Sequence, residues 1–572
     1  MYFLALATDY DGTIAHDGTV DADTLQALKR FKETGRKLIL VTGREMPDLK
    51  RVFPEPKIFD RIVAENGALI HDPATEEERT VAPPPPPAFV ETLKARGVGP
   101  ISVGKCIVAT WVPHENTVLE VIRDMGLELQ IIFNKGAVMI LPAGINKAVG
   151  LAAALKELDL AAANVVGVGD AENDHAFLRA CGCAAAVANA LPAVKDDADV
   201  QLGADHGAGV TQLVNTICRD DGAIVRPERH GLMLGHDAAE QPVYLEPHRG
   251  AVLIAGNSGA GKSTLATALT ERMTEKSLEF CILDPEGDYA SLENAICIGD
   301  AKNAPSAEEA MALVQKRACN VVVNTQAMTM TERPEFFAKL LPQLAALRAS
   351  TGRPHWLVID EAHHLLGASR ENVGELLPER LNGTIFITVH PDMVSAEALK
   401  TVRYMIGVGE QGSRALSVFC RAVRDTRLAD LPQSQAGEIV FYDRAANAPP
   451  RTLKPVRPKQ EHKRHTRKYA EGEFGVDSCF YFRGPQNRLN LRAQNLTLFA
   501  QIAEGVDEDT WEHHRRRGEY SKWFREVIHD DDLAREAAGI ESDDALDAND
   551  SRKRIVEAIG ERYTIGTRGQ DD

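Results

Sequence analysis

The sequence has 572 residues, with 65 basic and 83 acidic side chains that give a formal net charge of −18. Apolar residues make up 44% and charged residues 26%, which excludes collagen-like, coiled-coil and wholly disordered chains. At roughly 150 residues per domain, the length predicts about two to four domains. The negative charge disfavours a general nucleic-acid coat protein, because phosphate binding needs a cationic surface, but it leaves a local basic groove open.

The chain lacks the sequence signs of secretion or membrane insertion. It begins with a short apolar run that has no basic start, and no stretch approaches 18 apolar residues without a charge. The nine cysteines are odd in number and form no CxxC pair, so we expect buried, reduced thiols. These features predict a cytoplasmic protein with no membrane contact.

Short β-rich runs alternate with helical stretches over residues 1–225, as at 3–7, 23–32 and 37–41. A second alternation of the same kind occupies residues 226–450. The alternation predicts two α/β domains, each a mainly parallel sheet covered by helices.

The rest of the chain reads differently. Five prolines at 83–87 predict an exposed, stiff connector inside the first domain. Residues 451–475, with the basic stretch 459–468, are predicted to be a linker. Residues 476–572 are predicted to be a mainly helical region whose acidic tail, from Glu541 onwards, is expected to fray.

Two carboxylates follow the first predicted strand, in the motif Asp9-x-Asp11-Gly12-Thr13. Open α/β sheets place their sites at this end of a strand. One carboxylate can attack an electrophile while the second transfers a proton. Taken alone, the motif also fits a turn or a calcium loop.

Further motifs follow in order, each next to a predicted strand or helix. They are Val41-Thr42-Gly43-Arg44, Glu65-Asn66-Gly67-Ala68, Lys147 after Pro142-Ala-Gly-Ile-Asn146, and Gly169-Asp170-Ala-Glu-Asn173-Asp174. Together with DxDGT they resemble the Cof-type (IIB) branch of the haloacid dehalogenase (HAD) superfamily of phosphatases. The resemblance implies a Rossmann-like parallel sheet with an α/β cap, here at about residues 80–140, that selects a phosphorylated small-molecule substrate.

The resemblance also assigns roles to these residues. Asp9 would be the nucleophile that forms an aspartyl-phosphate, and Asp11 the general acid and base. Thr42 would hydrogen-bond the phosphoryl group, and Lys147 would neutralise its charge. A Mg²⁺ ion would be held by Asp9, the backbone carbonyl of Asp11 and Asp170, supported by Asn173 and Asp174. Clustered carboxylates repel one another, so a divalent cation is needed to keep them ionised together.

A phosphate-binding loop opens the second domain. The residues that match GxxxxGK[ST] are Gly256, Asn257, Ser258, Gly259, Ala260, Gly261, Lys262 and Ser263. They lie between a predicted strand, 252–255, and a predicted helix that opens at Thr264, which is the setting this motif requires. Backbone N–H groups would wrap the phosphates of ATP, Lys262 would reach the β and γ oxygens, and Ser263 would ligate Mg²⁺.

Adjacent carboxylates end a later apolar strand, in Trp356-Leu-Val-Ile-Asp360-Glu361. Asp360 would hold Mg²⁺ through water, and Glu361 could polarise the attacking water. The neighbouring pair His363-His364 suits a metal site less well than a site-lining or surface role, because no matching ligand spacing accompanies it.

Two more segments complete this set: Leu283-Asp-Pro-Glu-Gly-Asp-Tyr289 and Phe386-Ile-Thr-Val-His390. The set resembles the HerA/FtsK-type branch of P-loop ATPases over about residues 230–440. The resemblance implies a γ-phosphate sensor at Thr388 or His390, although the branch usually carries glutamine there. It also implies a ring-shaped homo-oligomer with an arginine supplied by a neighbouring subunit. The candidates for that arginine are Arg380, Arg403 and Arg414, each of which also fits a surface role.

Aromatic and basic residues interleave near the C-terminus, over residues 510–524, where two helices are predicted around Gly518. Such interleaving fits a surface for single-stranded nucleic acid. We favour the alternative, in which Trp511, Tyr520, Trp523 and Phe524 pack into a small helical core.

The whole sequence predicts a bifunctional protein, a Mg²⁺-dependent phosphomonoesterase fused to an ATPase. One alternative is a kinase–phosphatase that acts on a single substrate, such as polynucleotide ends or a sugar phosphate. Another is a nucleotide-sensing regulatory module, or a DNA-linked ATPase, attached to a phosphatase. Asp360 and Glu361 suit attack by water and favour an ATPase over a kinase.

Overall fold

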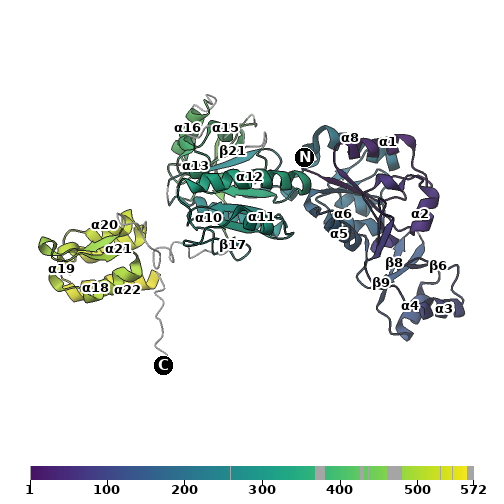
Figure 1. Ribbon diagram of the computed structural model, residues 1–572, viewed down its shortest axis with the longest axis horizontal. Coiled ribbons are helices and arrows are strands. Elements are labelled where there is room, and N and C mark those ends of the chain that lie inside the picture. The colour runs from purple at the N-terminus through teal and green to yellow at the C-terminus, as the bar shows by residue number, and fades with distance from the viewer. Residues whose placement is uncertain are drawn as a thin grey trace. The chain divides into compact units, whose positions relative to one another are not determined.

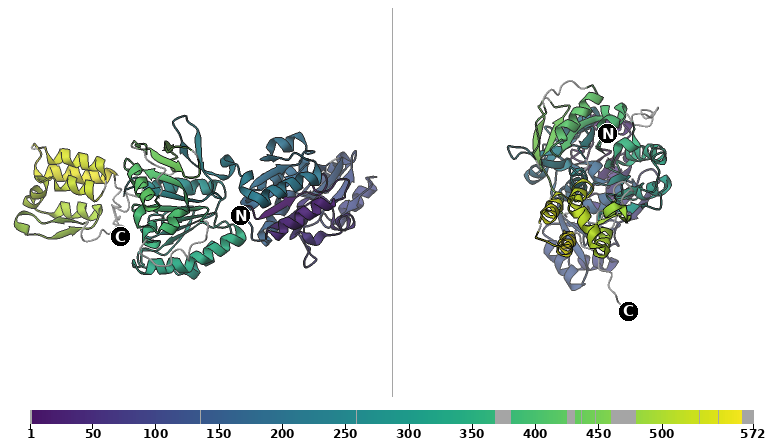
Figure 2. Two further views of the ribbon diagram at one scale, coloured as in Figure 1. Left: turned by 90° about the horizontal axis from the view of Figure 1, so that it is seen from above. Right: turned by 90° about the vertical axis from the view of Figure 1, so that its left-hand side faces the viewer.

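The computed structural model describes residues 2–134, 136–257, 259–367, 381–424, 431–435, 437–446, 448–459, 479–528, 530–543 and 545–562. The chain divides into two compact units, Met1–Arg457 and Pro458–Asp572, drawn in Figures 1 and 2. Within the described ranges, no helix is both long enough and apolar enough to cross a bilayer.

An eight-stranded sheet forms the first part of the larger unit. Its strands, in spatial order, are β12 (Val200–Gln201), β11 (Cys183–Ala186), β10 (Val165–Gly169), β1 (Ala5–Thr8), β2 (Lys37–Val41), β3 (Arg61–Ala64), β4 (Leu69–Asp72) and β5 (Glu77–Thr80). The strands from β12 to β3 are parallel, and β4 and β5 complete the sheet as antiparallel strands. The predicted parallel α/β sheet is confirmed.

Helices cover both faces of this sheet; Figure 1 shows α1 and α8 on one face and α5 and α6 on the other. The helices are α1 (Ala22–Glu33), α2 (Met46–Val52), α5 (Lys147–Glu157), α6 (His175–Ala180), α7 (Pro192–Asp197) and α8 (His206–Asp220), with short 3-10 turns η1 (Pro56–Ile58), η2 (Glu65–Gly67), η3 (Ala162–Asn164), η4 (Glu172–Asp174) and η5 (Asp221–Ile224). In α1, Ala27, Leu28 and Phe31 are buried at helical spacing and contribute to the core under the sheet.

A smaller antiparallel sheet is inserted between β5 and α5, where the sequence predicted a cap. Its strands, in order, are β6 (Ser102–Val103), β7 (Val108–Trp111), β9 (Ala137–Pro142) and β8 (Leu129–Asn134), and its helices are α3 (Pro87–Ala95) and α4 (Glu115–Asp124). Val108, Val138 and Ile140 face these helices because alternate residues of a strand share one face. Figure 1 shows the helices on the side of the cap sheet away from the larger sheet.

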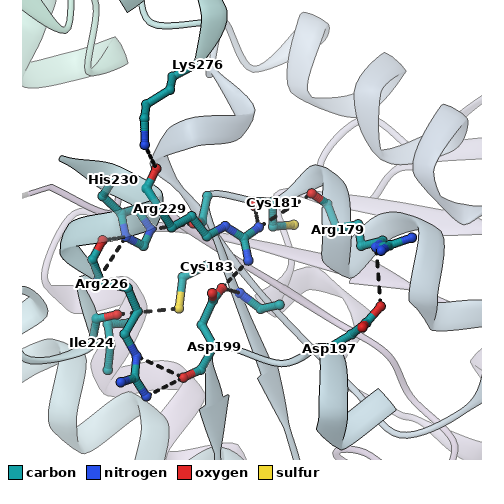
Figure 3. Close-up of polar contacts among 12 residues, drawn as sticks. Arg179, Cys181, Cys183, Asp197, Asp199, Ile224, Arg226, Arg229, His230 and Lys276 are labelled. Carbon is teal, nitrogen blue, oxygen red and sulfur yellow. Dashed lines mark hydrogen bonds and ion pairs between the residues drawn. The ribbon is translucent and has the colours of Figure 1, made fainter. Parts of the chain in front are cut away.

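The chain leaves the first sheet through the short helix α9 (Pro227–His230), shown in Figure 3. The Arg229 guanidinium pairs with Asp199 and donates to the carbonyl of Cys181 at 2.5 Å. Lys276, just beyond the helix that follows the phosphate-binding loop, donates to the carbonyl of Arg229 at 2.8 Å. The connecting segment is therefore hydrogen-bonded to both α/β regions.

An eleven-stranded sheet forms the rest of this unit. In order its strands are β14 (Pro242–Leu245), β13 (Leu232–His236), β23 (Arg451–Pro455), β22 (Ile439–Asp443), β21 (Val402–Val408), β15 (Ala251–Ala255), β20 (Thr384–Thr388), β19 (Trp356–Ile359), β16 (Phe280–Asp284), β18 (Val321–Asn324) and β17 (Ile296–Ile298). Strands β21 to β17 are parallel, and the four at the other end pair antiparallel.

Strand β23 differs from the sequence interpretation, which began a linker at residue 451. It pairs with both β22 and β13, and its Leu453 is buried opposite Ile439. Leu453 is the one buried residue of β23, and backbone pairing supplies the remaining contacts that hold the strand.

Helices again cover both faces of the larger sheet. They are α10 (Lys262–Glu275), α11 (Ala307–Val314), α12 (Glu332–Thr351), α13 (Ala362–Leu365), α15 (Ala396–Lys400) and α16 (Gly412–Ala422), with the 3-10 turn η6 (Pro391–Met393). Val252 and Ile254 of β15 belong to the same core as α10, while Leu253 between them belongs to the core under α11, α12 and α16. Both faces of β15 are buried, as a central parallel strand requires.

The described part of the smaller unit contains a two-stranded hairpin and five helices, and Figure 2 draws it in yellow and yellow-green. Its elements are β24 (Phe480–Phe482), η8 (Pro485–Asn487), β25 (Leu491–Ala493), α18 (Leu496–Gly505), α19 (Glu508–Arg515), α20 (Glu519–Glu526), α21 (Asp531–Glu541) and α22 (Ala548–Arg562). The turn at Gly518 has φ 64°, which separates the two predicted helices. Trp511, Tyr520, Trp523 and Phe524 are all buried, so the predicted aromatic core is confirmed.

The expectation that the acidic tail frays from Glu541 onwards is wrong for residues 548–562. Ile555 and Ile559 are fully buried, and Trp511 donates from Nε1 to Oγ of Ser551 at 2.9 Å. The segment is highly charged overall, but Ile555 and Ile559 lie four residues apart and therefore share one face of the helix. That face packs into the core. The basic stretch 460–468 and residues 563–572 lie outside the described residues.

All nine cysteines are free, and six are buried, in line with the prediction of reduced thiols. The six are Cys106, Cys181, Cys183, Cys281, Cys420 and Cys479. Burial raises the pKa of the Cys281 thiol to about 12, which keeps it protonated and unreactive.

Candidate functional site

The first site lies at the carboxyl ends of three neighbouring strands. Asp9 follows β1, Thr42 follows β2 and Asp170 follows β10. Because β1 pairs in parallel with both β2 and β10, the three side chains meet at one edge of the sheet. The structure therefore brings together residues that the sequence separates by up to 161 positions.

Lys147 is the first residue of α5, and its ammonium bridges two carboxylates. Its Nζ lies 2.6 Å from Oδ1 of Asp9 and 2.6 Å from Oδ1 of Asp174. All three side chains are at least 95% buried. The side chain of Asn146 caps α5 by accepting a hydrogen bond from the backbone N–H of Ala148. This cap fixes where the helix begins and therefore where Lys147 lies.

Asp9, Asp170 and Asp174 each offer a carboxylate oxygen within 4.8 Å of the others. Asp174 is already engaged, because its Oδ2 accepts the N–H groups of Asp170 and Ala171 while its Oδ1 binds Lys147. This leaves Asp9 and Asp170 as the direct donors. Their oxygen ligands fit a hard divalent cation such as Mg²⁺, with Asp174 orienting the loop.

Because Gly12 has no side chain, the carboxylate of Asp170 can lie directly against its backbone. A Cβ at Gly12 would lie 2.3 Å from Oδ2 of Asp170, and the residue has φ 90°. Thr13 donates from its hydroxyl to Oδ1 of the same carboxylate at 3.0 Å. The glycine of DxDGT is thus required by the close approach of the Asp170 carboxylate as well as by the turn.

The electrostatics of the cluster favour a bound cation. Burial and the carboxylate of Asp174 raise the pKa of Asp9 well above its usual value, against the lowering effect of Lys147. Burial acts to lower the pKa of Lys147, but the carboxylates of Asp174 and Asp9 outweigh it and raise that pKa. The lysine is charged, and a second positive charge would let Asp9 ionise at neutral pH.

Asp11 is turned to Arg44, outside the buried cluster. The Arg44 guanidinium donates from Nε and Nη2 to the two Asp11 oxygens, both at 2.7 Å, and also pairs with Asp48. The Asp11 side chain is 41% exposed. The sequence analysis included Arg44 in its second motif without giving it a role, because nothing in the linear pattern links it to Asp11.

Two amide side chains at this edge have atoms without partners. Nδ2 of Asn173 donates to Oδ1 of Asn66 at 3.0 Å, while Nδ2 of Asn66 and Oδ1 of Asn173 are buried with no hydrogen-bond partner among the described residues. Thr42 is fully buried, and its Oγ accepts from the N–H of Arg44. Buried polar atoms of this kind are normally satisfied by a ligand or water.

The second site lies where β15 turns into α10. The predicted loop residues that the structure describes are Gly256, Asn257, Gly259, Ala260, Gly261, Lys262, Ser263 and Thr264, and Ser258 lies outside the described residues. Gly261 has φ 96° and begins the helix, and Lys262 donates from Nζ to the carbonyl of Asn257 at 2.9 Å. The lysine is bound to its own loop.

A group of carboxylates faces Lys262. Oγ of Ser263 donates to Oδ2 of Asp288 at 3.0 Å, and Asp284 accepts the N–H groups of Asp288 and Tyr289. The sequence analysis quoted Asp288 within its DPEGD stretch without a role. The hydrogen bond places it beside the hydroxyl that was predicted to ligate Mg²⁺.

In the second site, as in the first, burial and neighbouring carboxylates disfavour the ionised form of an aspartate. Burial and then the carboxylates of Glu361, Asp284 and Asp288 raise the pKa of Asp360 well above its usual value. Burial lowers the pKa of Lys262, although the surrounding carboxylates oppose it. Oxygen donors that repel one another beside a phosphate-binding loop fit Mg²⁺ bound with a nucleotide.

Glu361 and the predicted sensor residues lie together. Nδ1 of His363 is 3.3 Å from the Glu361 carboxylate and 3.0 Å from Oγ of Thr388, which also accepts the N–H of His390. Burial and the neighbouring His364 and His390 lower the pKa of His363 to about 4, so it is neutral at pH 7. Among the described residues, the grouped metal-ligand side chains are Asp9, Asp170 and Asp174, and the histidine pair is not part of such a group.

The arginine candidates separate in the structure. Arg403 donates from Nε and Nη2 to Asp443 of its own chain, both at 2.8 Å. Its assignment to a neighbouring subunit's site stays a prediction. Arg414 is exposed on α16, and Arg380 lies outside the described residues.

Comparisons with known proteins agree with the two sites. A family described as haloacid dehalogenase-like hydrolase matches residues 6–95 and 118–214, and one described as the central domain of helicase HerA matches residues 231–366. The chain is 29% identical over 220 residues to a phosphoglycolate phosphatase of Methanothermobacter thermautotrophicus, covering 37% of this chain and 96% of that protein. It is also 29% identical over 222 residues to phosphoglycolate phosphatase 2 of Saccharolobus solfataricus, covering 37% and 92%.

Among solved structures, a haloacid dehalogenase-like hydrolase of Bacteroides thetaiotaomicron aligns with 18% identity and a TM-score of 0.34, covering 38% of this chain and 99% of that one. The sequence matches carry the assignment, since they include the strands and loops that hold Asp9, Asp170 and Lys262. The chain thus combines a domain of the haloacid dehalogenase-like hydrolase family with a domain of the HerA central-domain family.

Proposed function

We propose that residues 1–225 hydrolyse a phosphomonoester with Mg²⁺ through an aspartyl-phosphate, and that residues 226–450 bind and hydrolyse ATP. The segment that follows strand β23 would connect these domains to the C-terminal domain, 476–572. The observation that carries the phosphatase proposal is the buried ammonium of Lys147, which is shared by Asp9 and Asp174. A cation fixed beside a nucleophilic carboxylate is what transfer of a phosphoryl dianion requires.

In this proposal Asp9 attacks the phosphorus while Asp11 gives a proton to the leaving oxygen. Asp11 then takes a proton from the water that hydrolyses the aspartyl-phosphate, so one residue serves both half-reactions. Lys147 offsets the charge of Asp9 and of the phosphoryl oxygens throughout, and Thr42 donates a hydrogen bond to them. Mg²⁺ held by Asp9, the carbonyl of Asp11 and Asp170 would supply further charge neutralisation, with Asn173 and Asp174 supporting its ligands.

Arg44 sets a condition on this reaction. Its bidentate pair with Asp11 occupies both oxygens of the proposed acid and base. An incoming anionic substrate can draw the guanidinium away, because arginine binds phosphate and carboxylate groups with the same forked geometry. Binding of such a substrate would free Asp11 for proton transfer.

Phosphoglycolate is the first substrate to test. Both of the relatives named above are phosphoglycolate phosphatases, matched over more than nine-tenths of their length. The molecule is small and carries a carboxylate in addition to its phosphate, which suits a site with Arg44 beside Asp11.

The test is release of phosphate from phosphoglycolate by the full-length protein with and without Mg²⁺. We expect metal-dependent hydrolysis that Asp9→Asn abolishes, because the amide cannot form an acyl-phosphate. Glu77→Gln, an exposed change on β5, serves as the control and should leave the rate unchanged. Full activity in Asp9→Asn would refute the proposed nucleophile.

For the second domain we propose that Lys262 and Ser263 hold the phosphates and Mg²⁺ of ATP, with Asp360 behind the metal. Glu361 would activate the water, and Thr388 would sense the γ-phosphate. The carboxylates around Lys262 support this proposal, since Glu361, Asp284 and Asp288 disfavour ionisation of Asp360 and a cation would offset their repulsion. Assembly into a ring and a nucleic-acid partner stay predictions.

Labelled ATP distinguishes hydrolysis from phosphoryl transfer. We expect the γ-phosphate to appear as free phosphate and Lys262→Ala to stop its release. Label that appears instead in a sugar phosphate or at a polynucleotide end would establish the kinase alternative. Stimulation of hydrolysis by DNA, measured with the same assay, would identify a DNA-linked ATPase.

A further inference from the structure

Glu65 opens the Glu65-Asn66-Gly67-Ala68 motif, and the proposed chemistry leaves it without a role. Its side chain is buried, with the residue only 1% exposed. One carboxylate oxygen accepts from the N–H of Lys105 at 2.8 Å, and the other accepts from the N–H groups of Cys106 and Ile107 at 2.7 and 3.0 Å. Three successive amides of the cap thus point at one carboxylate of the core.

This contact, the Glu65 clamp, is shaped for a close fit. A Cβ at Gly104 would lie 2.7 Å from Cδ and Oε1 of Glu65, so the loop approaches as closely as glycine allows. A buried carboxylate is costly unless its oxygens are hydrogen-bonded, and bonds to an ionised acceptor are about twice as strong as neutral ones. The clamp therefore resists opening more than an ordinary loop contact does.

The clamp is joined directly to the proposed catalytic loop. The backbone N–H of Glu65 donates to the carbonyl of Arg44 at 3.0 Å, and that of Asn66 donates to the carbonyl of Thr42 at 3.0 Å. The Arg44 side chain in turn holds Asp11. A continuous set of hydrogen bonds leads from the cap loop, through Glu65, to the proposed acid and base.

The cap is also in place over the same loop. Cys106, Ile107 and Met139 of the cap form one buried cluster with Ala68 of the core. The sulfur of Met139 lies 3.8 Å from where a Cβ of Gly43 would be. The clamp loop thus contacts the core at Glu65, and the cap strand β9 approaches it at Gly43.

We propose that Glu65 is a positioning residue that docks the cap on the core and sets how the cap closes over a phosphoryl group at Asp9. The inference rests on the proposed phosphatase function for its kinetic consequence, but the docking itself does not. Closure of the cap excludes water and brings cap residues to the leaving group. Loss of the clamp would weaken binding of substrate more than it slows the chemical step.

The direct test is hydrogen–deuterium exchange of residues 104–107 in the full-length protein carrying Glu65→Gln. An amide side chain brings its own N–H against the loop, so we expect these amides to exchange at least about tenfold faster. Glu91→Gln, the same change at an exposed position of the cap helix α3, is the matched control and should leave exchange of these amides unchanged. Asp9→Asn should also leave exchange unchanged, which separates failure of the clamp from failure of the phosphatase proposal.

A double-mutant cycle gives the kinetic readout. Gly104→Ala pushes the loop off Glu65 from the other side, so it and Glu65→Gln should each raise KM for phosphoglycolate with a smaller change in kcat. The double variant should be no worse than either single one, because both remove the same contact. Unchanged exchange in Glu65→Gln, or additive effects in the cycle, would overturn the proposal.

Discussion

The two candidate sites differ in what their lysines bind. Lys147 lies between two carboxylates that belong to the proposed chemistry, so its charge is already where a phosphoryl group would arrive. Lys262 instead donates to a carbonyl of its own loop, and Ser263 donates to Asp288. The first site is assembled by tertiary contacts, whereas the lysine of the second bonds within its own loop.

The difference follows from how each site is built. The first one collects side chains from the ends of β1, β2 and β10 and from α5, which the core of the sheet holds rigidly. The second depends on a glycine-rich turn, whose backbone N–H groups would bind phosphate in the proposed function. Rigid elements give a preorganised site, and a loop gives one that changes on binding.

The largest expected effect comes from breaking the first site with Lys147→Met. The substitution keeps the length of the side chain but leaves two buried carboxylates uncompensated, which costs about 3–5 kcal/mol of stability. Phosphatase activity should fall at least about a hundredfold. Denaturant unfolding and phosphate release measure the two effects.

Lys156→Ala, at an exposed position of the same helix, is the control for that change. It should alter neither quantity. If Lys147→Met were as stable and active as the unaltered protein, the bridge would have no role.

The next effect tests whether the sites are separable. Lys262→Ala should lower ATP hydrolysis at least about a hundredfold, because the loop then lacks its only lysine near the phosphates. Phosphoglycolate hydrolysis should be unchanged, since Lys262 bonds to its own loop and not to the first site. A parallel fall in phosphatase activity would show that the two sites work as one.

We expect the contact between the two α/β regions to weaken at low pH, because His355 lies in this contact and becomes protonated. Its Nε2 meets Oδ1 of Asn164, and burial, with Arg348 and Arg353 nearby, lowers its pKa to about 3. On acidification, the imidazole of His355 takes up a proton at a higher pH in the unfolded chain than in the folded protein. The contribution of His355 to the free energy of unfolding is therefore complete above about pH 6.5 and is lost as pH falls towards 3. Between pH 6.5 and 5 the loss is about 2 kcal/mol.

Unfolding by denaturant at several pH values checks this sign. His355→Gln cannot take up a proton and should reduce the decline between pH 6.5 and 5. An unaltered slope in the variant would mean that other groups account for the acid sensitivity.

A smaller effect compares two glycines that have similar backbone angles. Gly12 has φ 90° and Gly35 has φ 87°, but a Cβ at Gly35 meets nothing within 4 Å. Replacing either by alanine should cost about 1 kcal/mol for the backbone alone. Gly12→Ala should also displace Asp170 and weaken activation by Mg²⁺ by about tenfold or more, whereas Gly35→Ala should not.

Titration of activity with Mg²⁺ separates the backbone cost from the displaced ligand. Equal metal dependence in both variants would contradict the place given to Asp170 beside Gly12.

Much of both sites followed from the sequence because their residues end predicted strands. Parallel strands bring their carboxyl ends together, so motifs at Asp9, Thr42 and Asp170 had to meet. The pairing of Arg44 with Asp11 and the docking of Glu65 on the cap were not predicted. Each depends on a side-chain contact between segments that are far apart in the sequence, and no spacing of residues indicates such a contact.

The two segments whose structure was predicted wrongly, β23 and α22, were missed for the same physical reason. Strand β23 and helix α22 are rich in charge, and each is held by few apolar residues, Leu453 in one and Ile555 with Ile559 in the other. Composition averages over such residues, while burial depends on their exact spacing. The aromatic core around Trp511 was predictable for the opposite reason, since large apolar side chains dominate the energetics of a small domain.

The account depends most on Asp9 as the nucleophile of a preassembled site. The direct measurement is mass spectrometry of the Asp11→Asn protein after mixing with phosphoglycolate and Mg²⁺. Asp11→Asn lacks both the proton donor for the leaving oxygen and the base that activates water, so the account predicts that a phosphoryl group appears slowly on the peptide that contains Asp9 and then persists, and that Asp9→Asn in the same protein removes it. Turnover of substrate with no phosphorylated Asp9, or a phosphoryl group on another residue, would contradict it.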